Sequence, residues 1–147
     1  MAEPENHLLT VNVVTPDGII YSHHAKYVQM RATDGDMTIM YDHMPIVAPL
    51  EINDVKIKRG QDMNNRLDEV AVNGGYVEFS NNVATIIADS AERARNIDAE
   101  RAQAAKQRAE KQIEEAKAKH DERKQLENEI ALRRAINRIN VRNHYRK

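Results

Sequence analysis

Four arginine residues in the second half of the chain have a spacing suited to binding an anion. Arg101 and Arg108 are seven residues apart and Arg134 and Arg138 are four apart, so each pair shares one helix face. If the chain reverses near residue 121, two antiparallel helices would bring the four guanidinium groups to one side. Guanidinium groups bind phosphate and carboxylate in bidentate fashion. The spacing therefore suggests a site for an anion or for an acidic surface.

A second interpretation of the same arginines needs no ligand. Charge-rich helices usually expose a solvated face with pairs at i,i+4, and Glu110, Glu114 and Glu115 could provide local partners. From spacing alone this arrangement is the more common one, so both interpretations stay open at this point.

The sequence gives little support for a metal site, a phosphate-binding loop or a catalytic site. His43 lies in a predicted loop without partners at metal-ligand spacing, and the adjacent His23 and His24 would point to opposite faces of a strand. Gly74-Gly75 is typical of a hairpin turn, and no phosphate-loop motif is present. No Ser-His-Asp, Cys-His or paired-carboxylate spacing stands out. We therefore predict no catalytic residues and no metal ligands.

Composition divides the chain into two parts. Residues 1–90 contain 6 Lys/Arg against 13 Asp/Glu, whereas residues 91–147 contain 16 against 10, and all glycines and prolines fall within residues 1–75. The 147 residues include no cysteine, no apolar run long enough to span a membrane and no basic segment at the start typical of a signal peptide. Any role at a membrane is therefore expected to be peripheral.

The first part predicts short β-strands. Alternating apolar residues in segments 8–15, 26–33, 54–60 and 66–89 are separated by turn sequences at residues 16–18, 33–36, 73–75 and 81–82, with a loop over residues 45–49. About eight to ten short strands are expected within roughly 85 residues, and this spacing favours a compact antiparallel sandwich or barrel.

The second part predicts two helices. Ala102, Ala105, Ala109, Ile113 and Ala116 repeat with a period near 3.5, beginning after a cap expected at Asn96, with Asp89 and Glu92 able to cap an earlier turn. The apolar pattern vanishes over residues 117–125. A second apolar face then follows, with these members: Leu126, Ile130, Ala131, Leu132, Ala135, Ile136 and Ile139. An antiparallel hairpin is favoured, because an alanine seam lets a second helix approach closely; one continuous helix is the alternative.

Four segments resemble the epsilon subunit family of the bacterial F-type (rotary) ATP synthase. They are "TPDGIIY", "GDMTIMYDHMPIVAPLE", "VNGGYVEFSNNVATIIADSAERA" and "IDAERAQAAKQRAE", and the similarity runs from about residue 8 to residue 141. The resemblance implies an α+β protein in two parts. Residues 1–89 would form an N-terminal antiparallel β-sandwich of about ten strands, and residues 90–147 a C-terminal antiparallel α-helical hairpin.

The resemblance also implies site residues. Members that bind ATP hold it without hydrolysis, and the matching positions here are Glu92, Ile97, Asp98, Arg101, Ala102, Arg108, Arg134 and Arg138. A loop from Asp36 to His43, including Asp42, resembles the contact with the ring of c subunits, although Tyr41-Asp42 replaces the family's usual Pro-Gly.

The function implied by the resemblance is that of a non-catalytic central-stalk subunit of a proton-translocating enzyme. It would bind the gamma subunit and the c-ring, and an extended hairpin would meet the alpha/beta catalytic head and inhibit ATP hydrolysis. ATP would be a regulatory ligand, no nucleic acid would be bound, and the location would be the cytoplasmic face of the bacterial plasma membrane. The alternatives are a nucleic-acid-associated β domain with a coiled-coil arm, which the basic second half permits, and an independent enzyme, which no residue pattern supports.

Overall fold

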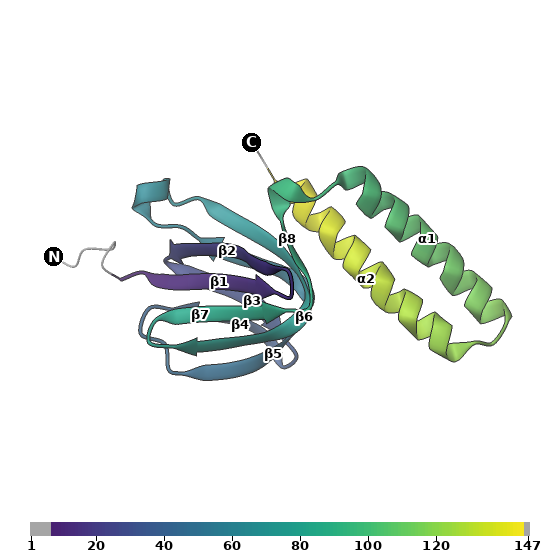
Figure 1. Ribbon diagram of the computed structural model, residues 1–147, viewed down its shortest axis with the longest axis horizontal. Coiled ribbons are helices and arrows are strands. Elements are labelled where there is room, and N and C mark those ends of the chain that lie inside the picture. Colours follow the sequence, from purple (N-terminus) through teal and green to yellow (C-terminus); the bar gives the residue numbers. More distant parts are fainter. Residues whose placement is uncertain (1–6, 146–147) are drawn as a thin grey trace. The chain divides into compact units, whose positions relative to one another are not determined.

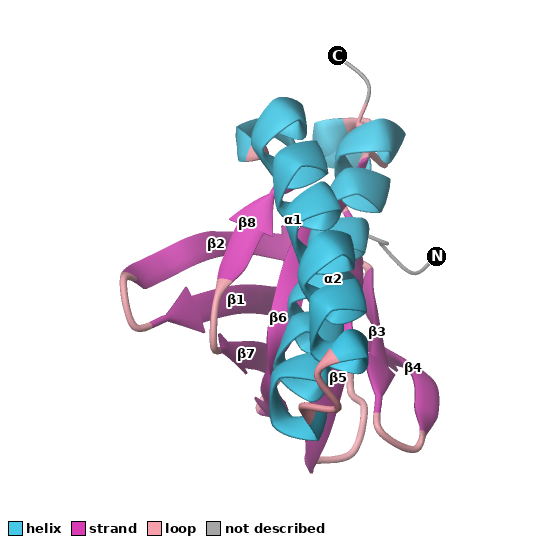
Figure 2. Ribbon diagram, turned by 90° about the vertical axis from the view of Figure 1, so that its right-hand side faces the viewer, coloured by secondary structure: helices cyan, strands magenta, loops and turns pink. Residues whose placement is uncertain are grey.

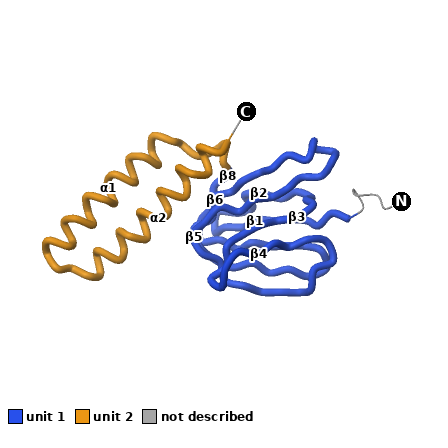
Figure 3. The backbone as a smooth tube through the Cα atoms, turned by 180° about the vertical axis from the view of Figure 1, so that it is seen from behind, with its two compact units in different colours: residues 1–93 blue, residues 94–147 orange. Residues whose placement is uncertain are grey.

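The computed structural model describes residues 7–145 and divides the chain into two compact units (Figures 1 and 3). The first unit spans Met1–Arg93 and the second Ala94–Lys147. We call them the β unit and the helical unit, and describe each by itself.

The β unit contains eight strands among its described residues (magenta in Figure 2). Seven of the strands are hydrogen-bonded to their neighbours in the order β2-β1-β7-β6-β5-β3-β4. The eighth strand, β8, also pairs with β6. The pairing of β1 with β7 is parallel and the other pairings are antiparallel. The strands are β1 (Leu9–Thr15), β2 (Gly18–Ala25), β3 (Tyr27–Ala32), β4 (Gly35–Met40), β5 (Ile46–Lys58), β6 (Leu67–Ser80), β7 (Val83–Ala88) and β8 (Ala91–Arg93), with a short 3-10 helix, η2 (Gln61–Met63), before β6.

Alternation of apolar and polar residues explains the core of the sandwich. Leu9, Val11 and Val13 are fully buried along β1 while the residues between them are half-buried. Val55 and Ile57 on β5 are buried in the same way, as predicted. Because side chains alternate between the faces of a strand, each strand presents one apolar face to the core, where burial contributes about 25 cal/mol per Å².

Two predicted turns are confirmed by backbone angles that suit their residues. Gly18, at the start of β2, has φ +120°, and Asn81 and Asn82, between β6 and β7, have φ 50° and 60°. Two residues in the left-handed region form the tight hairpin that the twist of antiparallel strands favours, and asparagine tolerates this region better than most residues.

The hairpin expected at Asn73-Gly74-Gly75 is wrong. These residues lie inside β6, which runs unbroken from Leu67 to Ser80 and pairs with β5 on both sides of them. A Cβ on Gly75 would overlap the carbonyl oxygen of Ile87 and lie 2.8 Å from the Cα of Ala88. Gly75 is therefore needed for the close approach of β7 to β6, and not for a reversal.

One predicted loop is corrected for a related reason. The eight strands agree with the eight to ten expected from the spacing and fall below the ten implied by the resemblance, because β5 and β6, of 13 and 14 residues, continue through positions where breaks were expected. The loop expected over residues 45–49 is mostly the start of β5, which includes Pro49. Proline fits there because its carbonyl oxygen still accepts a hydrogen bond from the Thr33 amide at 3.1 Å.

The helical unit is an antiparallel hairpin, as predicted. A short 3-10 helix, η3 (Ala94–Asn96), leads into α1 (Ala99–Ala118), and α2 (Glu122–His144) returns beside it (Figures 1 and 2). The reversal occupies residues 119–121, where His120 takes a positive φ of 54°. The expected caps at Asn96 and Asp89 are wrong, because Asn96 ends η3 and Glu92 lies in β8.

Aspartates begin both helices instead. The Asp98 carboxylate accepts a hydrogen bond from the Arg101 amide at 3.1 Å, and the Asp121 carboxylate accepts one from the Lys124 amide at 3.1 Å. Each satisfies an amide of the first turn that has no partner within the helix.

The alanine seam lies between the helices, but the apolar face predicted for α2 is only partly buried. Ala102, Ala109, Ile113 and Ala116 are buried on α1, whereas Leu126 and Ile136 on α2 are 59% and 38% exposed. The predicted α2 residues extend around more than one side of a helix with 3.6 residues per turn, so they cannot all face α1.

Candidate anion site and ring-facing loop

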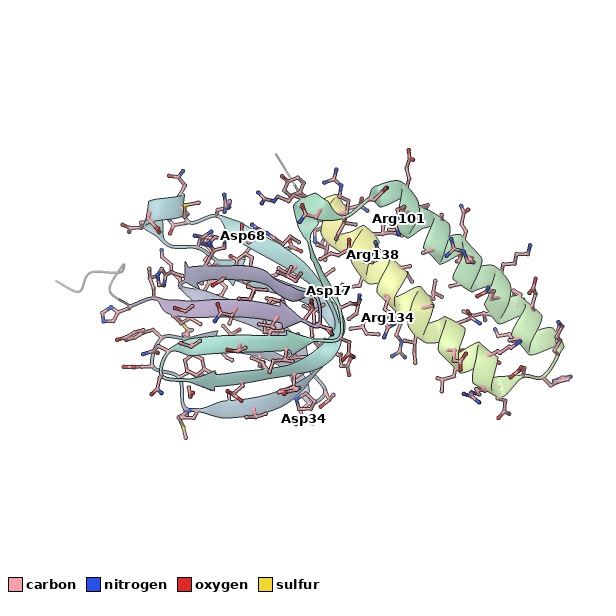
Figure 4. The ribbon with its side chains drawn as sticks, in the orientation of Figure 1. Asp17, Asp34, Asp68, Arg101, Arg134 and Arg138 are labelled. Atoms are coloured by element: carbon pink, nitrogen blue, oxygen red, sulfur yellow. The ribbon has the colours of Figure 1, made fainter. Side chains whose placement is uncertain are left out.

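The helical unit carries the arginines singled out by sequence. Arg101 lies in the first turn of α1 and Arg108 two turns later, while Arg134 and Arg138 are one turn apart on α2. Figure 4 shows Arg101 on α1 and Arg134 and Arg138 on the neighbouring helix. Arg138 is half-buried and the other three are exposed. Within residues 7–145, Arg101, Arg108 and Arg134 form no salt bridge, so local glutamates do not neutralise them in this conformation.

Three of the other residues expected at the nucleotide site, Ile97, Asp98 and Ala102, have structural roles in the helical unit. Ile97 and Ala102 are buried, with 3% and 0% of their surface exposed. Asp98 caps α1 through the Arg101 amide, so the spacing Asp-x-x-Arg places this carboxylate at the start of the helix that carries Arg101. Glu92 lies in β8 and therefore belongs to the β unit.

The residues expected at the c-ring separate into two places. Asp42 and His43 lie in the turn between β4 and β5, whereas Asp36 lies near the opposite end of β4 and pairs with Arg31 at 3.1 Å. The expected loop from Asp36 to His43 is therefore mostly a strand. Only Asp42 and His43 are brought together.

The β4–β5 turn is held by the neighbouring β6–β7 turn. The Asp42 amide donates to the Asn82 side-chain oxygen at 2.6 Å, and Asp42 has a φ of 64°. The His43 amide donates to the Met40 carbonyl at 3.1 Å, and the His43 ring meets the edge of Phe79 with centroids 5.9 Å apart. These contacts fix the backbone of an exposed turn.

Exposed apolar side chains surround this turn and were missed by the sequence analysis. Met40, Met44, Val47 and Val83 are 55%, 77%, 67% and 36% exposed. Adjacent exposed apolar residues often mark an interaction surface. The methionines within the segment "MYDHM" were the available signal, because methionine is often used at binding surfaces.

A buried ionic cluster in the β unit was also missed. The Asp68 carboxylate accepts hydrogen bonds from the Tyr21 hydroxyl at 2.7 Å and from Arg66 at 2.8 Å, and it pairs with the buried Arg59 at 3.4 Å. Burial alone would raise the pKa of Asp68, but these hydrogen bonds outweigh it and hold the pKa below its usual value. Burial, with Asp68 beside it, raises the pKa of the Tyr21 hydroxyl.

The two parts of the chain match two known protein-family models. The β-sandwich domain of the ATP synthase delta/epsilon chain matches residues 8–94, and the long α-helix domain of the same chain matches residues 95–143. An ATP synthase epsilon chain from Lactobacillus gasseri is 67% identical over 147 residues, which is 100% of both chains. One from Lactobacillus johnsonii is 66% identical over the same length.

A solved structure shares the fold at low sequence identity. A chain from the cryo-EM structure of Euglena gracilis mitochondrial ATP synthase, comprising OSCP, F1 and c-ring in rotational state 1, aligns with a TM-score of 0.76 and 18% identity. The alignment covers 94% of the present chain and 82% of that chain.

A β-sandwich followed by a helical hairpin, matched over nearly the whole length, defines a central-stalk subunit of a rotary ATP synthase. The chain belongs to the ATP synthase delta/epsilon family, as an epsilon chain of the bacterial enzyme. Epsilon chains are non-catalytic subunits of a complex that transports protons. The resemblance seen in the sequence is thus confirmed, and the nucleic-acid-associated alternative is replaced. No helix among residues 7–145 combines the length and apolar character needed to cross a membrane.

Proposed function

We propose that the β unit links the gamma subunit to the ring of c subunits at the cytoplasmic face of the plasma membrane. The turn containing Asp42 and His43 would contact the ring, with Met40 and Met44 providing apolar area. The rigid bracing of this turn by Asn82 supports the proposal, because a coupling contact must transmit torque without bending. Asp36 is not part of this contact in the proposal, since it lies at the other end of β4.

The helical unit would be the regulatory element. In the hairpin state the arginines would hold one ATP through its phosphates, without hydrolysis. In an extended state the basic end of α2 would reach acidic surfaces of the alpha/beta catalytic head and block hydrolytic rotation. That basic end comprises Arg133, Arg134, Arg138 and Arg142 together with Arg146 and Lys147, of which the last two lie outside the described residues.

The observation that supports this proposal most is the state of the arginines. Arg101, Arg108 and Arg134 are exposed and have no salt-bridge partner within the described part of the chain, although the helices carry several glutamates. Cations on neighbouring helices repel one another, so an anion that binds several of them favours the hairpin over the extended state. ATP shifts the equilibrium only as far as it binds the two states differently.

Isothermal titration calorimetry of the full chain tests the nucleotide site. ATP should bind, and Arg101→Ala with Arg134→Ala should weaken binding by about tenfold or more for each lost charge-assisted contact. Arg123→Ala serves as a matched control, because Arg123 is an exposed arginine near the turn that pairs with Glu127. If the double variant binds ATP as the unmodified chain does, these arginines do not form the site.

A further inference from the structure

Three arginines, Arg59, Arg66 and Arg93, lie near Tyr21 and Asp68 where β5 and β8 end and β6 begins, in the β unit. The guanidinium groups of Arg59 and Arg66 pair with Asp68, which is labelled in Figure 4. The Arg93 guanidinium lies over the ring of Tyr21, whose hydroxyl donates to Asp68. The two oxygens of Asp68 are already occupied by Arg59, Arg66 and the Tyr21 hydroxyl. One carboxylate thus pairs with two arginines, and a third arginine contacts the tyrosine that is bonded to it.

Arg59 is the structural member of this cluster. Its side chain is 6% exposed, and it donates through Nε to the carbonyl oxygen of His24 at 3.0 Å as well as to Asp68. A buried guanidinium with both contacts satisfied is the expected partner of a buried carboxylate. The surplus charge therefore resides on the other two arginines.

Arg93 and Arg66 keep donors available. The Arg93 guanidinium lies over the face of Tyr21, with its central carbon 5.1 Å from the ring centroid. A cation–π contact does not use the N–H groups of the guanidinium as hydrogen-bond donors to an anion, and Arg93 forms no salt bridge within residues 7–145. Arg66 binds Asp68 through Nε and its side chain is 48% exposed, so its terminal nitrogens can reach a second anion.

We propose that Arg66 and Arg93, with the ring of His23 beside them, form a second anion site that accepts a single oxyanion, either free phosphate or a carboxylate. The His23 and Tyr21 rings form a T-shaped contact with centroids 4.7 Å apart, and Arg93 lies over the same Tyr21 ring. All three residues belong to the β unit, whereas the four arginines of the nucleotide proposal belong to the helical unit.

The titration of His23 supports the proposal. Burial, together with the positive charges of Arg59 and Arg93, lowers the pKa of His23, while Asp68 acts in the opposite direction and Arg66 adds to the lowering. An imidazole in surplus positive potential becomes easier to protonate when an anion neutralises that potential. Binding of an anion should therefore raise the pKa of His23.

NMR titration of the full chain provides the test. The probes are inorganic phosphate and sodium acetate, each compared with sodium chloride at equal ionic strength, and the signals are the His23 ring and the arginine Nε–H groups. We expect saturable shifts with phosphate, with acetate or with both, and a higher pKa of His23 at saturation. Saturation by phosphate alone indicates a phosphate site, and by acetate alone a carboxylate site.

Variants distinguish binding at this site from general ionic screening and from binding to the arginines of the hairpin. Arg93→Gln and Arg66→Gln should each weaken the apparent affinity by about tenfold, as expected for the loss of one charge-assisted contact. Arg31→Gln, a half-exposed arginine paired with Asp36, and Arg134→Gln should leave it unchanged. Shifts that rise without saturation and match those in sodium chloride, or that survive in both site variants, would overturn the proposal.

Discussion

At the scale of single residues, Asp68 is the carboxylate that balances the buried charge of Arg59 in the β unit. Its carboxylate joins β6 to Tyr21 on β2 and to Arg59 after β5, so one side chain ties segments far apart in the sequence. Removing one member of a buried ionic group leaves the others without compensation, which costs more than the loss of an exposed pair.

Asp68→Asn should destabilise the protein by about 3 kcal/mol, because Arg59 would remain buried without its counter-charge. Chemical unfolding at pH 7 measures this change. The matched control is Asp36→Asn, whose side chain is 80% exposed and pairs with the half-exposed Arg31, and it should cost less than about 1 kcal/mol. Equal effects of the two substitutions would show that the Asp68 cluster is not the stabilising element inferred here.

His23 should make stability depend on pH. Its pKa is lowered in the folded chain, so the unfolded chain binds the proton more readily as the pH falls below about 6.5, and folding loses stability in that range. His23→Gln should flatten the dependence of the unfolding free energy between about pH 6.5 and 5. His24→Gln, at the exposed neighbouring residue, should leave the pH dependence of the unfolding free energy unchanged. If that pH dependence persists in His23→Gln, another titratable group causes it.

At the scale of elements, Asp98 in the segment "IDAERA" is the residue that caps the start of α1. Asp98 begins α1, so Asp98→Ala should cost about 1 kcal/mol and fray the turn that carries Arg101. Amide hydrogen exchange should show faster exchange over the first turn of α1. Asp121→Ala is the control, because it should loosen the start of α2 instead; identical exchange profiles for the two variants would contradict separate caps.

The kink in β6 depends on glycine in the same specific way. Gly75→Ala places a Cβ against the backbone of Ile87 and Ala88, in a backbone conformation with φ +127° that alanine rarely adopts. We expect a loss of more than about 2 kcal/mol in thermal or chemical unfolding. Gly35→Ala, at a turn with φ +130° and open space around it, should cost less, so a larger effect at Gly35 would argue against close approach as the reason for Gly75.

Local sequence patterns predicted the helices and most strands better than they predicted the turns and the long-range contacts between strands. The alanine seam and the polar break over residues 117–125 correctly predicted the hairpin. Asn73-Gly74-Gly75 misled because the same positive-φ glycines serve a turn and a strand kink, and only the position of Ile87 separates the two. Tyr21 and Asp68 are 47 residues apart, so no local spacing could have shown their contact.

At the scale of the whole molecule, the two units have different tasks in the proposal. Ending the chain after Arg93 keeps β8 and its pairing with β6, which a cut after Ser90 would remove. In the assembled enzyme, this truncation should leave ATP synthesis coupled to proton flow and abolish the inhibition of ATP hydrolysis. Coupling and hydrolysis assays on the same membranes provide the measurement. Failure of the truncated chain to assemble would contradict this division of tasks.

The central claim is that ATP favours the hairpin over an extended arm in the assembled enzyme. The chain has no cysteine, so Gln103→Cys and Asn140→Cys, both exposed, can carry a pair of spin labels without background. In the hairpin the two helices lie roughly 8–10 Å apart, whereas one continuous helix would separate these positions by about 55 Å. Pulsed electron resonance should show the short distance gaining population when ATP is added. A long distance that ATP leaves unchanged would contradict the account.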